Sequence, residues 1–390
     1  MSENTQAAPA AKAPAARFGG KGLNIGIVVA AVVTVAGLAL WGMQLSGGLV
    51  QTGMRNFDSW GLYITMFMFL VGLSAGGLII SSVPRAFGMK GFGGISKIAV
   101  WTSICCTVLA VGFVVIDLGQ PLRLWELFAY SNLGSPLMWD IAVISIYLIL
   151  SVVYLWATLR AEAGKVSEKA LRVISVVALV TAVLVHSVTA WIFGLQQAHE
   201  FWHTALMGPW FVASALDCGT ALVLIVVVAL QKAGRLTIER SSMVNLAKML
   251  AVFTCVDLYF FACDLLTSGF PGGEGANVVA MLVTGPLAPF FWTQIACMVL
   301  ACVILFVPRL RTKGGVVLAS ALVIAGVFCK AYEKAVLLTP TEENVRIWVK
   351  CTRMTKEEME DTIKESRELA DVFTAIASLM ERILPERGML

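Results

Sequence analysis

The stretch WGLYITMFMFLVGLSAGGLIISSV, residues 60–83, decides the fold because it is long, apolar and free of charged side chains. At about 1.5 Å per residue, a helix of this length spans the roughly 30 Å hydrocarbon core of a bilayer. Within it, Gly72 and Gly76 form a G-x-x-x-G pattern, which favours close packing against another helix. The whole chain is 58% hydrophobic and 14% charged. Soluble domains carry about 25% charged residues, so the composition predicts an integral membrane protein.

Nine segments of this kind follow one another along the chain. We therefore expect an all-α polytopic membrane protein with spans at residues 24–45, 60–83, 95–116, 137–159, 170–195, 209–231, 243–266, 286–307 and 315–338. Lys and Arg gather in the N-terminal tail and after every second span, and they are scarce in the other connections. Because cytoplasmic loops are rich in Lys and Arg, this pattern predicts a cytoplasmic N-terminus. Positive charge confined to short loops also indicates that nucleic acid is not a partner.

The two ends of the chain differ from the predicted membrane domain, residues 23–338. Residues 1–22 are rich in Ala and Pro and lack an apolar core, so we expect a disordered tail. Residues 339–390 are expected to form a soluble C-terminal tail. Residues 355–358 fit a capping box, and apolar residues then recur with a helical period as far as Ile383. This pattern predicts an amphipathic helix on the outer side, which either rests on the bilayer or docks a partner.

Ionisable residues occur inside four of the apolar segments, namely His186, Asp217, Asp257 and Glu333. Counted from the helix ends, they lie roughly 8–14 Å below the outer boundary. A charged group at a bilayer centre is unfavourable by roughly 2.5–3.5 kcal/mol, so such groups pair, line a cavity or handle protons. We expect His186, Asp217 and Asp257 to form one catalytic polar site, although each could instead be a satisfied packing residue. Lys330 lies one turn from Glu333, and we expect a local structural pair, either Lys330 with Glu333 or Glu333 with Lys334.

An imidazole beside a carboxylate suits proton exchange with a bound quinone oxygen, because histidine titrates near neutral pH. Tyr63, near the outer end of the second segment, adds a hydroxyl that suits the same proton exchange with a quinone oxygen. Alternatively, it is an interfacial aromatic anchor. The outer connection DLGQPLRLWELFAYSNLGSPLMWD, residues 117–140, combines charges, turn residues and aromatics. It is either a docking face or the lip of a pocket.

Metal and haem signals are weak in this sequence. Residues 199–203, HEFWH, match the zinc motif H-E-x-x-H, but the only other histidine is His186 on a membrane segment. A metalloprotease therefore remains a minor alternative, and we expect no metal site. A membrane haem pair commonly needs four axial histidines, and the cysteines have no cluster spacing. We expect the protein to have no haem or iron–sulfur cluster of its own, so another subunit must carry electrons.

Residues 60–77, 117–140, 186–196 and 203–219 resemble the NrfD/PsrC family, the membrane subunits of polysulfide-reductase-like molybdenum oxidoreductase complexes. The patterns D-L-G-x-P-x-R and S-P-x-x-W are the most specific part of the match. The resemblance implies two four-helix bundles with an extra helix, and a pocket for a quinone, expected to be menaquinone, near the outer surface. It also implies a four-cluster iron–sulfur partner subunit, a molybdopterin catalytic subunit and a bacterial cytoplasmic (inner) membrane location. At matching positions it makes Tyr63, Asp117, Arg123 and His186 candidates for quinone binding, and Asp217 a candidate for a proton path.

The sequence thus predicts a membrane anchor subunit, in which protons pass through intramembrane His and Asp residues while electrons move between quinone and an iron–sulfur partner. Whether the protein is non-catalytic or itself holds the quinone site is left open. An ion or solute transporter that uses the same acids is the alternative from another class. Many family members continue into a tenth span where this sequence has its soluble tail, and that difference argues against a functional role for Lys330 and Glu333.

Overall fold

The computed structural model describes residues 21–52, 60–88, 93–196 and 202–336. The protein divides into two units, Met1–Leu338 and Thr339–Leu390, and every described residue belongs to the first. The predicted C-terminal amphipathic helix and most of the predicted N-terminal tail lie outside the described residues, as do His199 and Glu200.

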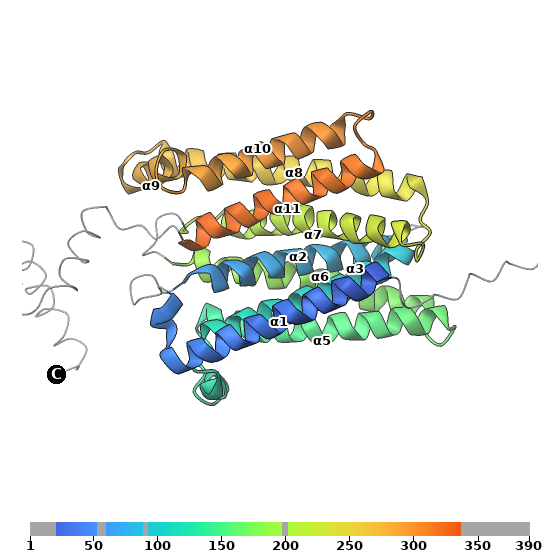
Figure 1. The fold of residues 1–390 in the computed structure, drawn as a ribbon, viewed down its shortest axis with the longest axis horizontal. Coiled ribbons are helices and arrows are strands. Elements are labelled where there is room, and N and C mark those ends of the chain that lie inside the picture. The colour runs from blue at the N-terminus through green and yellow to red at the C-terminus, as the bar shows by residue number, and fades with distance from the viewer. Residues whose placement is uncertain (1–20, 53–59, 89–92, 197–201, 337–390) are drawn as a thin grey trace, which may run out of the picture. The chain divides into compact units, whose positions relative to one another are not determined.

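The described residues form helices and no strand, as the sequence predicts (Figure 1). Nine of the described helices are long and apolar enough to cross a bilayer: α1 (Lys21–Gly47), α2 (Leu62–Ala86), α3 (Gly93–Asp117), α5 (Pro136–Glu162), α6 (Glu168–Gly194), α7 (Met207–Lys232), α8 (Arg240–Gly269), α10 (Ala288–Phe306) and α11 (Lys313–Val336). Each coincides with one predicted segment, so the predicted spans are confirmed. Short helices lie in the connections: η1 (Leu49–Thr52), η2 (Pro121–Arg123), α4 (Glu126–Ala129) and α9 (Gly273–Val283).

The spans form two four-helix bundles, as the family resemblance implied (Figure 1). In the first bundle, α2 and α5 each pack against both α3 and α6. In the second bundle, α7 and α10 each pack against both α8 and α11. The two bundles meet where α2 packs against α7 and α11.

Glycine permits the close contact between the bundles. A Cβ on Gly76 would clash with the carbonyl group of Ala215, and a Cβ on Gly219 would lie 2.5 Å from the Cα of Gly76. The backbones of α2 and α7 therefore touch where neither helix has a side chain. At Gly76, this geometry confirms the packing interpretation of the G-x-x-x-G pattern.

A buried group of hydroxyls joins three helices of the first bundle. The Tyr147 hydroxyl on α5 lies 2.9 Å from Ser74 Oγ and 2.7 Å from Ser103 Oγ, and Ser74 Oγ lies 2.6 Å from Thr107 Oγ1. Interhelical hydrogen bonds in membranes contribute about 0.6 kcal/mol on average. They therefore fix the register of α2, α3 and α5 more than they add to stability.

Helix α1 is the extra helix of the family architecture. Its large aliphatic side chains from Ile25 to Leu40 are exposed in the structure, and such an all-apolar surface faces lipid in a bilayer. Near its end, the buried Gln44 side chain donates from Nε2 to the carbonyl oxygen of Ile116 at 3.3 Å. The same side chain accepts a hydrogen bond from the Tyr63 hydroxyl at 2.5 Å. These bonds tie α1 to α2 and α3 at the predicted outer end.

Candidate functional sites

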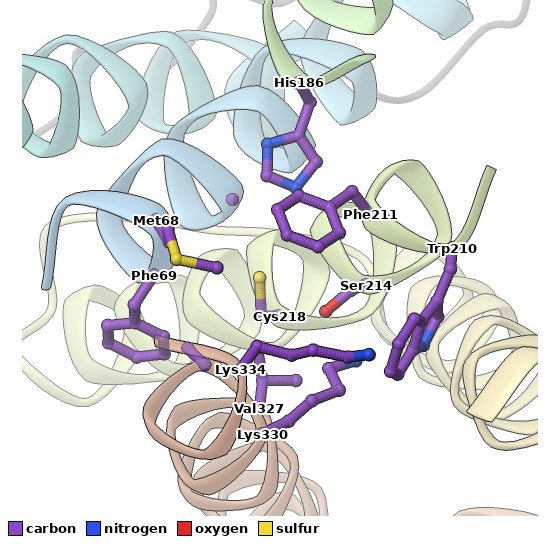
Figure 2. A pocket seen from close by; sticks show the side chains of 12 residues that line it. Met68, Phe69, His186, Trp210, Phe211, Ser214, Cys218, Val327, Lys330 and Lys334 are labelled. Atoms are coloured by element: carbon purple, nitrogen blue, oxygen red, sulfur yellow. The ribbon is translucent and has the colours of Figure 1, made fainter. Parts of the chain in front are cut away.

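A small cavity lies between the two bundles, and we call it the inter-bundle cavity (Figure 2). Its volume of about 30 Å³ leaves room for one or two water molecules. Four helices contribute its lining: Met68, Phe69 and Gly72 from α2, His186 from α6, Trp210, Phe211, Ser214 and Cys218 from α7, and Val327, Lys330, Ala331 and Lys334 from α11. The lining is mostly apolar and aromatic, with a few polar groups, which is typical of small-molecule sites.

His186 forms one wall of this cavity. Its side chain is buried, its ring centroid lies 5.4 Å from that of Phe211, and its Nδ1 has no hydrogen-bond partner. The ring lies against Gly72, where an added Cβ would stand only 3.6 Å from Nε2. Figure 2 shows the imidazole on one side of the cavity and the lysine side chains on the other. The imidazole therefore keeps hydrogen-bonding capacity for a ligand.

Lys330 and Lys334 on α11 each reach across to a buried aspartate on α8. Lys330 Nζ lies 2.6 Å from Asp257 Oδ1, and Lys334 Nζ lies 2.9 Å from Asp264 Oδ2. Both ammonium groups also lie over the Trp210 ring, at 5.2 and 4.8 Å from its centroid. The predicted Lys330–Glu333 pair is therefore wrong. The reason is that the long side chain of a lysine reaches a fully buried carboxylate on another helix, which otherwise would have no counter-ion.

The structure brings Asp217 and Asp257 together. Asp217 is fully buried on α7, and neither of its oxygens has a hydrogen-bond partner. The carboxyl of Asp257 faces it closely enough for a hydrogen bond once one of the two carries a proton. His186 lines the cavity and the two aspartates do not, so the prediction that the three residues form one catalytic polar site stays a prediction.

Tyr63 and Asp117 lie in a different place, which we call the outer cluster together with Gln44. Tyr63 donates a hydrogen bond to Gln44, and the Gln44 amide donates to the carbonyl oxygen of Ile116, the residue before Asp117. Among the described residues, the buried Asp117 Oδ1 has no hydrogen-bond partner. Nine residues separate Tyr63 from Gly72, so they lie about 13 Å apart along α2 and on opposite faces of it. The outer cluster and the His186 site are therefore separate.

Arg123 is at the surface. Its guanidinium donates from Nε and Nη2 to the two carboxylate oxygens of Glu126, both at 2.8 Å. The hydrogen bond from Arg123 lowers the pKa of Glu126. Both residues line a surface groove of about 590 Å³ formed by the connection between α3 and α5. The structure thus places Arg123 with neither His186 nor Tyr63.

The described residues contain no group of three side chains that could hold a metal ion. Of the HEFWH motif, His203 is described, and its Nδ1 lies 3.2 Å from the carbonyl oxygen of Gly194. His199 and Glu200 lie outside the described residues.

Sequence reasoning missed Gln44 and Asp264, and it missed the pairing of Lys334 with Asp264. Asp264 follows Asp257 by seven residues, and Lys334 follows Lys330 by four, so each pair repeats on one helical face. Matching an acidic face to a basic face would have indicated the α8–α11 contact. Gln44 gives no comparable signal, since a single amide near a helix end is common.

Comparisons with known proteins show which sequences this chain resembles. Residues 50–340 match the family model described as polysulphide reductase, NrfD. A protein of Halobacterium salinarum, named provisionally as a membrane subunit of dimethyl sulfoxide reductase, is 33% identical over 76% of this sequence and 73% of its own length. The Hdr-like menaquinol oxidoreductase integral membrane subunit of Archaeoglobus fulgidus is 27% identical over 68% and 66%. A polysulfide reductase chain of Wolinella succinogenes is 24% identical over 73% and 94%.

Proposed function

Because the chain belongs to the polysulphide reductase NrfD family, we propose that it binds menaquinone or its quinol and exchanges electrons with an iron–sulfur subunit of a respiratory oxidoreductase. Relatives named as membrane subunits of dimethyl sulfoxide reductase and menaquinol oxidoreductase, and as a part of polysulfide reductase, support a membrane anchor role. The iron–sulfur subunit holds four clusters and passes electrons to or from a molybdopterin subunit. The protein lies in a bacterial cytoplasmic membrane with its N-terminus in the cytoplasm.

The observation that carries the proposal is the pair of polar walls in the inter-bundle cavity. A quinone ring has two carbonyl oxygens on opposite edges, and each accepts a hydrogen bond. His186 on one wall donates to one oxygen, and Lys330 on the other wall donates to the second. An ammonium group has three N–H donors, so Lys330 can hold Asp257 and still bind a ligand. Phe211 and Trp210 supply the apolar surface that a quinone ring needs.

Quinone reaches this cavity from the bilayer along the seam between α2 and α11. Phe69 and Phe328 meet edge to face across that seam, with ring centroids 5.5 Å apart, and both are half-buried. The cavity of about 30 Å³ is smaller than a quinone ring. The ring therefore enters only when Phe69 and the flexible Met68 side chain rotate away.

The outer cluster is the other location for a headgroup. Tyr63, Gln44 and Asp117 offer a phenol, an amide and a buried carboxylate next to the lipid-facing helix α1. We place the headgroup at His186 because that cavity is enclosed by aromatic walls and leads to the buried acids Asp217 and Asp257, which exchange its protons. Arg123 lies outside both locations, paired with Glu126.

Quinone-analogue binding to the purified complex tests the proposal. His186→Gln should weaken binding roughly 3- to 10-fold, which corresponds to one lost hydrogen bond of about 0.5–1.5 kcal/mol. Tyr259→Phe, which removes a hydroxyl from the exposed face of α8, is the control and should bind as the wild type does. Weaker binding by Tyr63→Phe together with normal binding by His186→Gln would move the headgroup to the outer cluster and contradict the assignment.

The transporter alternative has its own test. The isolated protein is reconstituted into liposomes without partner subunits, and the uptake of ions is measured. Uptake that is lost in Asp217→Asn would favour a transporter. No uptake, together with quinone binding by the complex, supports the electron-transfer role.

A further inference from the structure

The second bundle contains a buried row of charged residues, which we call the carboxyl–lysine ladder: Asp217, Asp257, Asp264, Lys330, Glu333 and Lys334. The charged pairs of the ladder lie one after another along α8 and α11, starting near the C-terminal ends of these helices. Lys334 pairs with Asp264 nearest those ends, Lys330 pairs with Asp257 two turns further along α8, and Asp217 on α7 faces Asp257. Figure 2 shows the two lysine side chains running side by side toward Trp210.

The charges of the ladder do not balance if every group is ionised. Within the described residues, four carboxyl groups face two ammonium groups, so two of these carboxyl groups have no lysine of their own. An uncompensated charge in a membrane interior is unfavourable by several kcal/mol, and a buried acid avoids that by holding a proton. The ladder therefore needs two protons to be neutral.

The hydrogen-bond pattern identifies which acids hold them. Asp257 and Asp264 each have a lysine, whereas all four oxygens of Asp217 and Glu333 are buried without a hydrogen-bond partner in the part of the chain that the structure describes. Two ionised carboxylates cannot hydrogen-bond to each other because both only accept. A protonated Asp217 can donate to Asp257, which explains why these two acids face each other.

We propose that Asp217 and Glu333 are protonated in the resting protein, and that the ladder is a store of two protons that opens to the predicted outer side of the membrane. The number matches the chemistry of the proposed substrate. Oxidation of a quinol releases two electrons, which go to the iron–sulfur partner, and two protons, which the ladder passes outward; reduction runs in reverse. The protonation of Asp217 and Glu333 does not depend on the proposed function. The coupling of this proton store to quinol rests on the proposed function.

Lys330 connects the ladder to the inter-bundle cavity, since it lines the cavity and holds Asp257. Among the described residues, the titratable side chains near the ladder include His186 across the cavity, Cys218 on α7, Cys255 on α8, Cys297 and Cys302 on α10, and Cys329 on α11. None of these side chains is a lysine or an arginine, so none adds a permanent positive charge. The count of two protons therefore holds as long as His186 is neutral.

The ladder ends near the outer boundary and is closed in the other direction. Lys334 and Asp264 lie about 3 and 8 Å from the ends of α11 and α8 by helical rise. Toward the inner side, about 22 Å of α7 remain beyond Asp217. Most fully buried side chains of that layer are apolar, among them Leu224, Val227, Leu246, Leu250, Val323 and Leu305. Its buried polar side chains are hydroxyls, and those of Thr220 and Thr254 donate to carbonyl oxygens of their own helices. A hollow of about 240 Å³ between α2, α7 and α8 also has only apolar lining.

Infrared spectroscopy of the purified full complex tests the protonation state. The expected result is a carboxylic-acid C=O band that loses intensity in Asp217→Asn and again in Glu333→Gln. The matched control is Glu162→Gln, because Glu162 is an exposed carboxylate paired with Lys97 and should not contribute. Both substitutions keep the shape and the neutral state of the proposed acids, so folding is preserved. An unchanged band in both variants overturns the proposal.

Proton release in sealed, oriented vesicles tests the side. After a quinol pulse, a membrane-impermeant pH dye on the outer face should report two protons per quinol, and Glu333→Gln should slow their appearance at least 3-fold. Protons that appear on the inner face overturn the outward path. If quinol drives no electron transfer while the infrared bands behave as expected, the proposed function fails and the proton store stands.

Discussion

Lys330 on α11 donates a hydrogen bond to Asp257 on α8, with Nζ 2.6 Å from Oδ1, although 73 residues separate them in the sequence. The pair is buried and closes the second bundle between its second and last spans. It also lies at the edge of the inter-bundle cavity, so the same contact serves packing and the proposed site.

Breaking this pair on one side should destabilise the second bundle strongly. Lys330→Met leaves Asp257 without a cation, and the free energy of unfolding should fall by about 3–5 kcal/mol, as for other buried pairs. The double variant Lys330→Met/Asp257→Asn should recover much of the loss. Unfolding in a denaturing detergent measures this cycle. Lys97→Met is the control, because Lys97 and Glu162 are partly exposed and should change stability by about 0–1 kcal/mol. An equal loss of unfolding free energy in Lys330→Met and Lys97→Met would contradict the buried-pair argument.

Adding a methyl group at the bundle crossing should separate the bundles. Gly219→Ala forces a Cβ into the backbone of Gly76, and overpacking of this kind lowers stability by about 1–3 kcal/mol. Gly112→Ala on α3, where a Cβ meets nothing within 4 Å, should leave stability unchanged or slightly higher. Thermal unfolding of the purified protein compares them, and similar curves for the two variants would refute the close contact.

Loss of the imidazole should stop quinol chemistry without dissociating the complex. His186→Ala removes the donor on one wall of the inter-bundle cavity, at a side chain that is buried in the protein. We expect quinol-driven turnover to be abolished while the partner subunits still co-purify. His203→Ala, at an exposed histidine, should retain turnover. Loss of co-purification in His186→Ala would instead assign the residue a structural role.

The Arg123–Glu126 pair should make the α3–α5 connection sensitive to acid. Because Arg123 lowers the pKa of Glu126, the pair stabilises the folded connection above the ordinary glutamate pKa, and this contribution is lost as the pH falls through the lowered value. Amide hydrogen exchange in residues 121–130 should therefore accelerate in acid relative to the intrinsic rate. Arg123→Gln should remove that acceleration, whereas an unchanged pH profile in the variant would exclude the pair as its cause.

The spans could be predicted because each is a long apolar run, and their number and order follow from the runs alone. Residue 219 shows the limit of such patterns: Gly76 predicts close packing, but only the fold identifies Gly219 as its counterpart. Family motifs supplied the two-bundle arrangement, which composition could not.

The site was harder to predict because depth along a helix does not reveal which face a residue occupies. His186, Asp217 and Asp257 have similar depths, and the structure places the first on the cavity wall and the other two together behind Lys330. Tyr63 is also near the outer boundary, yet it points to the opposite face of α2 and contacts Gln44. Long-range partners such as Lys330 and Asp257 depend on which helices become neighbours, and that is a property of the assembled bundle.

The pairing of α8 with α11 also has a consequence for biosynthesis. During translation, α8 enters the membrane with Asp257 and Asp264 well before the ribosome has made Lys330 and Lys334. Each uncompensated charge opposes partitioning into lipid by roughly 2.5–3.5 kcal/mol on insertion scales. Until α11 is made, Asp257 and Asp264 therefore lack the lysines that neutralise them in the folded protein. A truncated protein that ends before Lys330 would present two stranded acids to the membrane and so become a substrate for quality-control proteolysis.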